Sequence, residues 1–220
     1  MANPTPTTAE YPPDAPLFPI QEAAVIMPRP SELERIHTER LVLRPLRTES
    51  DVDAAGVFRI RGRQDVIDWL WPRIPDAGPE DTKKWARKKV FPTPDGAGAV
   101  GDRLFYFVVT RKGDADSDSP ESIIGAVGVN SLDPAPSVGY SFHPDVWGKG
   151  YATEAVRAVV GAWWDLPRAW SFEEEKLYAG VNCANVGSVR VLEKVGFEVY
   201  EYVQYDDRLA FMCMGRPRKQ

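Results

Sequence analysis

Apolar residues recur along this chain with two different spacings. Short runs that are apolar throughout, or that alternate with polar residues, predict strands at residues 40–46, 104–111, 123–132, 137–143, 176–181, 197–205 and 208–214. Stretches in which apolar residues recur every three or four positions predict helices at residues 48–60, 78–90, 151–166 and 185–195. Residues 67–75 are aromatic and rich in proline, which predicts a loop or a broken helix.

The order of these elements predicts the fold class. A strand is followed by helical segments, three strands, a helix, a strand, a helix and a closing hairpin of two strands. That order fits a mixed sheet with helices on its faces, an α+β (mixed α/β) fold. Residues 1–33 stand apart, because the first 30 residues hold eight of the 20 prolines. We therefore expect an extended, passive N-terminal arm, followed by one domain at residues 34–220.

Composition and charge exclude several classes of protein. Hydrophobic residues make up 43% of the 220 residues and charged residues 27%, as in ordinary globular proteins. No apolar run approaches the length of a membrane span, and the N-terminus lacks the regions of a signal peptide. Two cysteines imply no disulfide framework, so a cytoplasmic protein is expected. A net charge of −5 argues against a nucleic-acid partner. No cluster of His, Cys and Asp has metal-ligand spacing, so no metal is expected.

The stretch DVWGKGYATEA, residues 145–155, places two glycines around Lys149 where a strand gives way to a helix. The first turn of a helix leaves N–H groups unpaired, and glycines let a phosphate approach them closely. This junction therefore predicts a site for a phosphate or pyrophosphate. Its sequence matches neither the kinase-type P-loop nor the dinucleotide fingerprint. Taken alone, it fits equally well a tight turn that binds nothing.

A second segment changes that balance. Residues 182–198, NCANVGSVRVLEKVGFE, together with residues 139–155, GYSFHPDVWGKGYATEA, resemble the GNAT superfamily of acyl-CoA-dependent N-acetyltransferases. The opening HTERLVLRPLRTESDVDA, residues 37–54, is typical of the branch that includes the ribosomal-protein N-terminal acetyltransferases. The resemblance covers about residues 36–214. It implies a mostly antiparallel sheet that splays open between its fourth and fifth strands, with acetyl-CoA in the gap.

The resemblance also implies the residues that bind acetyl-CoA. The strand edge at Phe142 and His143 is expected to hold the pantetheine and the acetyl carbonyl through main-chain hydrogen bonds. The family's phosphate motif corresponds here to residues 147–152, with Trp147 where the family usually has Gln or Arg. Asn185 matches an asparagine that contacts pantetheine, although its position also fits a helix N-cap. The expected acetyl-CoA-binding residues are Phe142, His143, Trp147, Gly148, Lys149, Gly150, Tyr151, Ala152, Thr153, Asn185 and Ser188.

The implied reaction moves an acetyl group from a thioester to an amine, which must lose a proton while the departing sulfur gains one. Ser188 is our first candidate for the donor to the sulfur, and Tyr178 is the alternative. For the base the sequence offers His143, while Glu201 and Asp206 are comparable guesses and a chain of waters is another possibility. No residue type at these positions separates these alternatives.

The acceptor is not identified by the sequence. The parts that form the substrate pocket in the family contain Trp69, Trp71 and Tyr202, together with Trp85 and Tyr205. We consider an acetyltransferase acting on a small amine or an amino-acid-like acceptor, an enzyme acting on protein N-termini or lysines, and a non-catalytic acyl-CoA-binding module. An arm packed across the groove would favour the small acceptor. The sequence allows a monomer or a homodimer.

Overall fold

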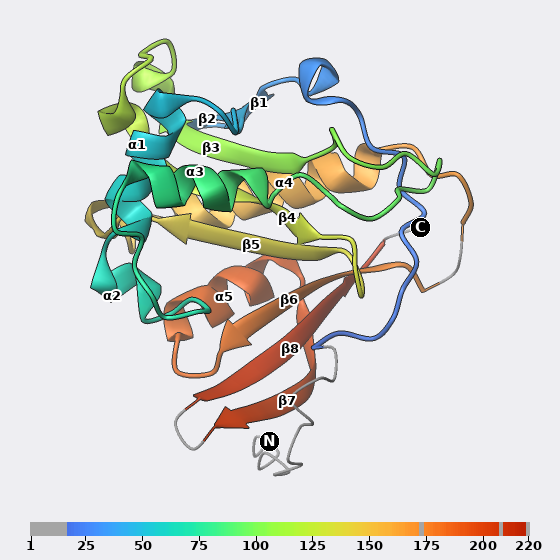
Figure 1. The fold of residues 1–220 in the computed structure, drawn as a ribbon. Helices are drawn as coiled ribbons and strands as arrows, with labels where there is room; N and C mark the ends of the chain where they lie inside the picture. The colour runs from blue at the N-terminus through green and yellow to red at the C-terminus, as the bar shows by residue number, and fades with distance from the viewer. Residues whose placement is uncertain (1–16, 172–173, 207–208, 219–220) are drawn as a thin grey trace.

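The computed structural model describes residues 17–171, 174–206 and 209–218, without the side chains of residues 204–213. Its centre is an eight-stranded sheet (Figure 1) with the strand order β1-β2-β3-β4-β5-β6-β8-β7. Neighbouring strands are antiparallel except β5 and β6, which are parallel. The strands are β1 (Ile36–His37), β2 (Leu41–Pro45), β3 (Phe105–Arg111), β4 (Ile123–Ser131), β5 (Ser137–Phe142), β6 (Lys176–Asn182), β7 (Glu198–Asp206) and β8 (Leu209–Pro217).

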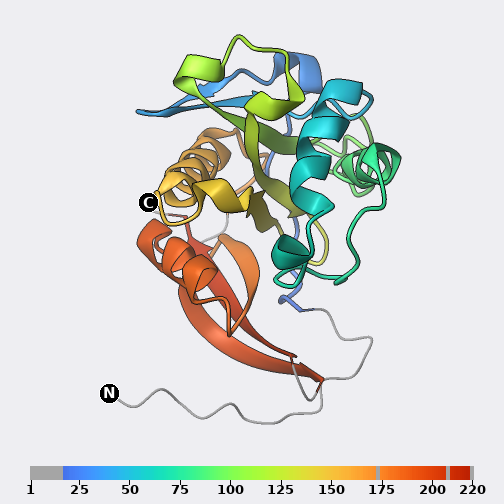
Figure 2. The same cartoon turned by 90° about the vertical axis from the view of Figure 1, so that its left-hand side faces the viewer.

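Helices cover both faces of the sheet. They are α1 (Asp51–Arg61), α2 (Gln64–Ile67), α3 (Pro79–Arg87), α4 (Tyr151–Asp165) and α5 (Val186–Val195). Figure 2 shows α4 and α5 on one side of the sheet and α1 and α3 on the other. The predicted α+β fold is thus confirmed. Among the described strands, the short edge strand β1 was not predicted, because its two residues carry no apolar pattern of their own.

Local sequence explains where these helices begin and end. Ser50 caps α1, since its side chain accepts a hydrogen bond from the N–H of Asp53. Asn185 caps α5 in the same way by accepting from the N–H of Ser188. Gly196 ends α5 in the left-handed region, with φ of 95°. Residues 67–75, which were predicted as a loop or a broken helix, form a loop that follows the single turn of α2 at Gln64–Ile67.

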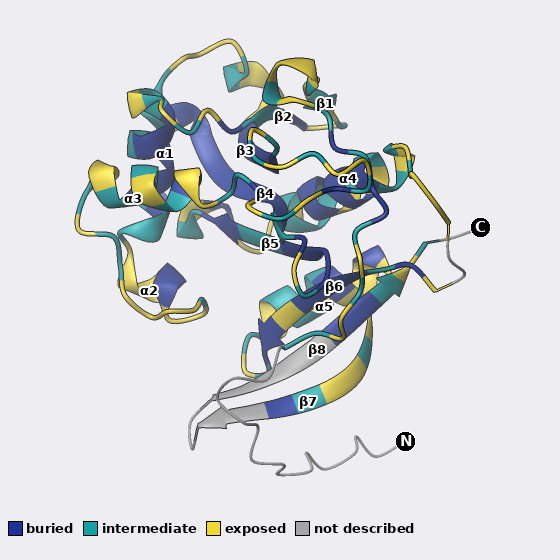
Figure 3. Cartoon of the chain, turned by 45° about the vertical axis from the view of Figure 1, so that its right-hand side comes forward, coloured by how far each residue is buried: buried dark blue, intermediate teal, exposed yellow. Residues whose placement is uncertain are grey.

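Two apolar cores hold the layers together, one on each face. The larger joins α4 and α5 to the sheet, and Trp163 lies fully buried within it. The smaller joins α1 and α3 to β3 and β4, with Val57 and Tyr106 among its members. Figure 3 shows the central strands buried, while the outer faces of the helices alternate between intermediate and exposed. A helix with one face against the core and the opposite face toward solvent is what the helical spacing of apolar residues predicts.

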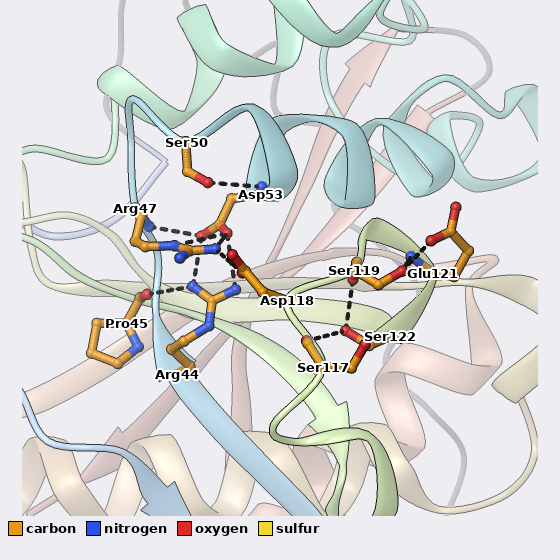
Figure 4. Close-up of polar contacts among 10 residues, drawn as sticks. All are labelled: Arg44, Pro45, Arg47, Ser50, Asp53, Ser117, Asp118, Ser119, Glu121 and Ser122. Atoms are coloured by element: carbon orange, nitrogen blue, oxygen red, sulfur yellow. Dashed lines mark hydrogen bonds and ion pairs between the residues drawn. The ribbon is translucent and has the colours of Figure 1, made fainter.

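A buried carboxylate fixes the start of α1 against the sheet. Asp53, whose side chain is 1% exposed, accepts hydrogen bonds from Arg44 at 2.8 and 2.9 Å and from Arg47 at 2.7 Å. Figure 4 shows both guanidinium groups pointing at the Asp53 carboxylate, with Asp118 beside Arg47. Burial by itself would raise the pKa of Asp53, but these hydrogen bonds outweigh it and hold the pKa below its ordinary value.

The described part of the N-terminal arm packs on the domain. Ala24, Val25 and Met27 are buried, with at most 3% of their surface exposed. The main-chain N–H of Gln21 donates to the carbonyl of Pro134 at 2.8 Å, and its side-chain amide exchanges hydrogen bonds with the main chain of Lys176. From residue 17 onward the arm is therefore not a free passive tail, in contrast to the expectation from the sequence.

Candidate active site

The sheet opens between β5 and β6. These two strands pair only at Ser137 and Tyr178, and beyond that point they diverge. They are the fourth and fifth strands of the sequence analysis, because β1 was not predicted, so the expected splay is confirmed. The N–H of His143 donates to Ile124 on the β4 side. Since successive N–H groups of a strand point in opposite directions, those of Tyr140 and Phe142 face the gap.

The glycine loop stands at the mouth of this gap. Gly148 and Gly150 have φ of 72° and 80°, in the left-handed region that favours glycine. Gly150 is the N-cap of α4 and has no side chain to pair with the first turn. The first N–H of this helix bonded to a carbonyl is that of Glu154, which donates to Gly150. The N–H groups of Tyr151, Ala152 and Thr153 are thus left for an anionic ligand.

An ion pair holds this loop in place. The carboxylate of Glu154 accepts from the Nε and the main-chain N–H of Arg40 at 2.7 and 2.8 Å, and from the hydroxyl of Thr38 at 2.6 Å. Arg40 also donates to the carbonyl of Lys149 at 3.0 Å and lies over the ring of Tyr151. The loop is therefore tied to the turn between β1 and β2, which prepares its N–H groups before any ligand arrives.

One cavity runs from the glycine loop into the gap and has a volume of about 440 Å³. Its walls come from the loop and the start of α4 on one side and from α5 on the other. Two cations of α5, Arg190 and Lys194, line it. Unpaired N–H groups, nearby cations and a free strand edge are what a long, flexible ligand with phosphates at one end requires.

The second cavity is larger, about 770 Å³, and lies on the α1–α3 face of the sheet. Trp69, Trp71 and Trp85 line it, and Leu17 and Phe18 of the N-terminal arm line it as well. Its volume falls in the range of small-molecule sites. The two cavities share part of their walls, namely Trp69, Leu70, Tyr140, Ser141, Asn185 and Ser188.

Tyr140, Ser141 and Ser188 bring hydroxyl groups to this shared wall, and two of them lie across the gap from each other. Tyr140 reaches across the gap and donates its hydroxyl to the carbonyl of Ser188 at 3.2 Å. Burial raises the pKa of Tyr140 to about 12, so this hydroxyl keeps its proton at neutral pH. The main-chain N–H of Ser188 donates to the side chain of Asn185 and its carbonyl accepts from Tyr140, while its hydroxyl has no hydrogen-bond partner among the residues that the structure describes. The shared wall can thus supply a proton where the contents of the two cavities meet.

A family model identifies the family to which this chain belongs. The model for the acetyltransferase (GNAT) domain matches residues 40–198. The chain belongs to the GNAT acetyltransferase family. It is an acetyl-CoA-dependent acetyltransferase, and the cleft beside the glycine loop fits the phosphates and the pantetheine arm of that co-substrate.

Solved structures share this fold. A GNAT-family acetyltransferase from Bacillus anthracis has a TM-score of 0.61 at 19% identity, covering 85% of this chain and 100% of its own. The ribosomal-protein-S5-alanine acetyltransferase from Vibrio fischeri has a TM-score of 0.59 at 20% identity, covering 86% and 98%. AAC(6')-Ib in complex with ribostamycin and coenzyme A has a TM-score of 0.56 at 18% identity, covering 82% and 94%. No curated protein sequence matches the chain significantly.

Most of the predicted acetyl-CoA-binding residues of this GNAT domain lie together. Those on the wall of the smaller cavity are Phe142, Trp147, Gly148, Gly150, Tyr151, Ala152, Thr153, Asn185 and Ser188. Lys149 is not on that wall, because its ammonium turns back and donates to the carbonyl of Asp145 at 2.7 Å. The Trp147 indole donates to the carbonyl of Phe142 at 2.8 Å, so it braces the end of β5.

His143 lies outside both cavities. Its main-chain N–H donates to Ile124 and its carbonyl accepts from Val146. Neither group is therefore available to bind the pantetheine, although the family resemblance implied that role. Its ring caps the turn that follows, and its Nδ1 lies 3.4 Å from the carboxylate of Asp145. Burial lowers the pKa of His143 and outweighs the opposite effect of the nearby Asp145 carboxylate. The placement favours a structural role over that of the base.

The other candidates divide according to which side of their strand they occupy. Tyr178 is buried between the rings of Phe18 and Tyr200 and is not on the wall of either cavity. Tyr202 also misses both walls, whereas the next residue, Val203, lines the larger cavity, because adjacent side chains of a strand face opposite sides. Glu201 is exposed on β7, and the side chains of Tyr205 and Asp206 lie outside the described residues.

The sequence analysis missed Tyr140, Ser141, Lys89 and Asn130 on these walls. Their relevance depends on pairing between segments that are distant in sequence. Among the described residues, no group of three or more His, Cys, Asp and Glu could hold a metal ion. No helix in the described part of the chain is long and apolar enough to cross a membrane.

Proposed function

We propose that this GNAT enzyme acetylates the primary amine of a small molecule or of an amino-acid-like acceptor, bound in the larger cavity. The observation that carries the proposal is the part played by the N-terminal arm, since Leu17 and Phe18 form part of the cavity wall. Leu17 lies so close to β6 that a Cβ on Gly180 would come within 2.8 Å of it. An arm in that position narrows the surface over which a folded protein would have to dock.

The chemistry follows from the shared wall of the two cavities. Acetyl-CoA supplies an acetyl thioester, and the acceptor nitrogen forms a bond to the acetyl carbon as the carbon–sulfur bond breaks. The N–H groups of Tyr140 and Phe142 that face the gap are suited to polarise the acetyl carbonyl. We propose that the hydroxyl of Ser188 donates a hydrogen bond or proton to the departing sulfur. Tyr140 is the alternative donor on the same wall.

The proton on the acceptor amine has no obvious carboxylate to receive it. Among the described residues, no Asp or Glu lines either cavity, and His143 lies outside both. We therefore propose that water in the open cavity takes this proton, or that the amine enters uncharged. In either case the rate of transfer rises with pH up to the pKa of the acceptor.

The test is a turnover assay with purified protein and acetyl-CoA. Release of free thiol is measured against a panel of small primary amines and amino acids, and against peptides with free N-termini, with products verified by mass spectrometry. We expect small acceptors to give the higher kcat/KM. A clear preference for peptides would contradict the proposal and favour an enzyme acting on protein N-termini. Tight coenzyme A binding without turnover of any amine would instead indicate a non-catalytic module.

A further inference from the structure

A lysine with an unusual environment lines the larger cavity. Lys89 follows the end of α3 and is partly buried. Its ammonium donates to the side-chain carbonyl of Asn130 at 2.7 Å and lies over the rings of Trp85 and Tyr106, at 4.9 and 5.0 Å from their centroids. These contacts hold the ammonium in one place but supply no formal negative charge.

No carboxylate balances this cation. The cavity wall has two cationic side chains, Arg61 and Lys89, and no Asp or Glu among the described residues. Arg61 is already matched, since Asp76 accepts from it at 2.8 and 3.0 Å. Lys89 forms no ion pair with any described residue. Burial, followed by repulsion from Arg61 and Lys88, lowers the pKa of Lys89 to about 7. An anionic ligand would relieve that strain on the charged form.

The position of Lys89 relative to the shared wall sets the size of such a ligand. Its partner Asn130 lies against Gly139 of β5, where an added Cβ would come within 2.0 Å of the Asn130 amide nitrogen. Tyr140 and Ser141, which border both cavities, are the next two residues of that strand. Strand residues rise about 3.3 Å each, so the ammonium lies roughly 3 to 7 Å along β5 from the point of transfer. A carboxylate bonded to the ammonium at about 2.8 Å, with an amine one carbon away as in an amino acid, spans a comparable distance.

We propose that the acceptor carries a carboxylate as well as its amine, and that the carboxylate binds the Lys89 ammonium beside Asn130. This inference rests on the proposed function and names the acceptor's chemical class. The amine then lies toward Ser188, and the tryptophans Trp69, Trp71 and Trp85 surround an apolar or aromatic body. The same wall disfavours an acceptor with several positive charges, because the described residues that line it include two cations and no carboxylate.

The experiment compares acceptors that differ only in the carboxylate. Phenylalanine and tryptophan are assayed beside their amides and beside phenethylamine and tryptamine. Three variants are measured, namely Lys89→Met, Lys89→Arg and the neighbouring exposed Lys88→Met as the matched control. We expect the wild type to prefer the carboxylates. Lys89→Met should raise KM for them roughly 10- to 100-fold, the cost of one hydrogen-bonded charge pair.

The same variant should leave kcat, and the kinetics of the amides and amines, within about threefold of wild type. Lys89→Arg should retain part of the preference, and Lys88→Met all of it. Thermal unfolding verifies that Lys89→Met is folded, and we expect no fall in Tm because a buried cation is removed. Equal use of carboxylates and neutral amines by the wild type would overturn the inference. A fall in kcat for every acceptor in Lys89→Met would also overturn it, since Lys89 would then act as the base.

A second readout separates this inference from the proposed function. Calorimetric titration of the amino acids in the presence of coenzyme A measures binding without turnover. If no amine is acetylated but amino acids bind and Lys89→Met abolishes that binding, the acetylation proposal fails and the carboxylate site stands. If amines are acetylated but amino acids do not bind more tightly than their amides, the carboxylate site fails alone.

Discussion

Gly150→Ala tests whether the glycine loop binds acetyl-CoA through its backbone shape. Gly150 has φ of 80°, a conformation that costs a residue with a Cβ about 1 to 2 kcal/mol. The added Cβ would meet only the Nη2 atom of Arg40, at 3.3 Å. This is the far end of a flexible side chain, so the steric contribution is small. Backbone strain is therefore the main expected effect.

A thermodynamic cycle divides that strain between two measurable quantities. If the mutant loop keeps its shape without ligand, the free energy of unfolding falls by about 1 to 2 kcal/mol and the Kd for acetyl-CoA is unchanged. If the mutant loop relaxes without ligand, the free energy of unfolding is unchanged and the Kd for acetyl-CoA rises about 5- to 30-fold. The two losses should sum to about 1 to 2 kcal/mol, because the bound loop is strained in either case.

Chemical denaturation and calorimetric titration with acetyl-CoA supply the two terms. Gly161→Ala is the matched control, since a Cβ there meets nothing within 4 Å and the residue lies inside α4. It should stabilise the protein by roughly 0.5 to 1 kcal/mol and calibrates the effect of the substitution on the unfolded chain. Lys149→Ala should leave the Kd nearly unchanged, because that side chain turns away from the cleft. A summed loss near zero for Gly150→Ala would refute the reasoning.

Three further predictions concern stability and turnover. Asp53→Asn should lower the free energy of unfolding by about 3 to 5 kcal/mol in a denaturant titration, because two guanidinium groups lose a buried negative charge. Because the fold lowers the pKa of Asp53 from 3.8, the wild type should also lose stability as the pH falls below about 4. The variant should lose less stability over that pH range. Glu175→Gln should lower the free energy of unfolding by a similar amount, since it removes the negative charge that pairs with the buried Arg168. An unchanged Tm would show that this ion pair contributes nothing to stability. Ser188→Ala should lower kcat and kcat/KM together by roughly 10- to 1000-fold while the Kd for acetyl-CoA stays constant, whereas a lowered Tm with normal kcat would leave Ser188 a structural residue and direct attention to Tyr140.

The sequence predicted the features of this protein that depend on neighbouring residues. The glycine loop, the cap at Asn185 and the helical stripe of α4 are all local, and each lies where expected. The splay between β5 and β6 followed from the family resemblance, not from the pattern of apolar residues. Spacing alone does not reveal how far two parallel strands pair.

The missed features depend on contacts between distant segments. In the sequence, Lys89 is one of several basic residues at the end of a predicted helix. Only the packing of α3 over β3 and β4 places it against Tyr106 and Asn130. The error on His143 has a similar cause. Its position at the end of β5 suggested the mouth of the gap, but the direction of its N–H is set by pairing with β4. The parity of a strand end is not fixed by the strand's own residues.

Gln21 fastens the two halves of the sheet at the closed end of the gap, one bond on the segment before β5 and two on the start of β6. These bonds lie beside the Ser137–Tyr178 pairing, where β5 and β6 are closest before they diverge. The N-terminal arm thus helps to hold β5 and β6 together at the closed end of the cleft. Removing residues 17–21, which lie outside the region that matches the family model, would remove these hydrogen bonds together with part of the wall of the larger cavity. We therefore expect a change in this segment, which the family model does not cover, to alter both the affinity for acetyl-CoA and the choice of acceptor.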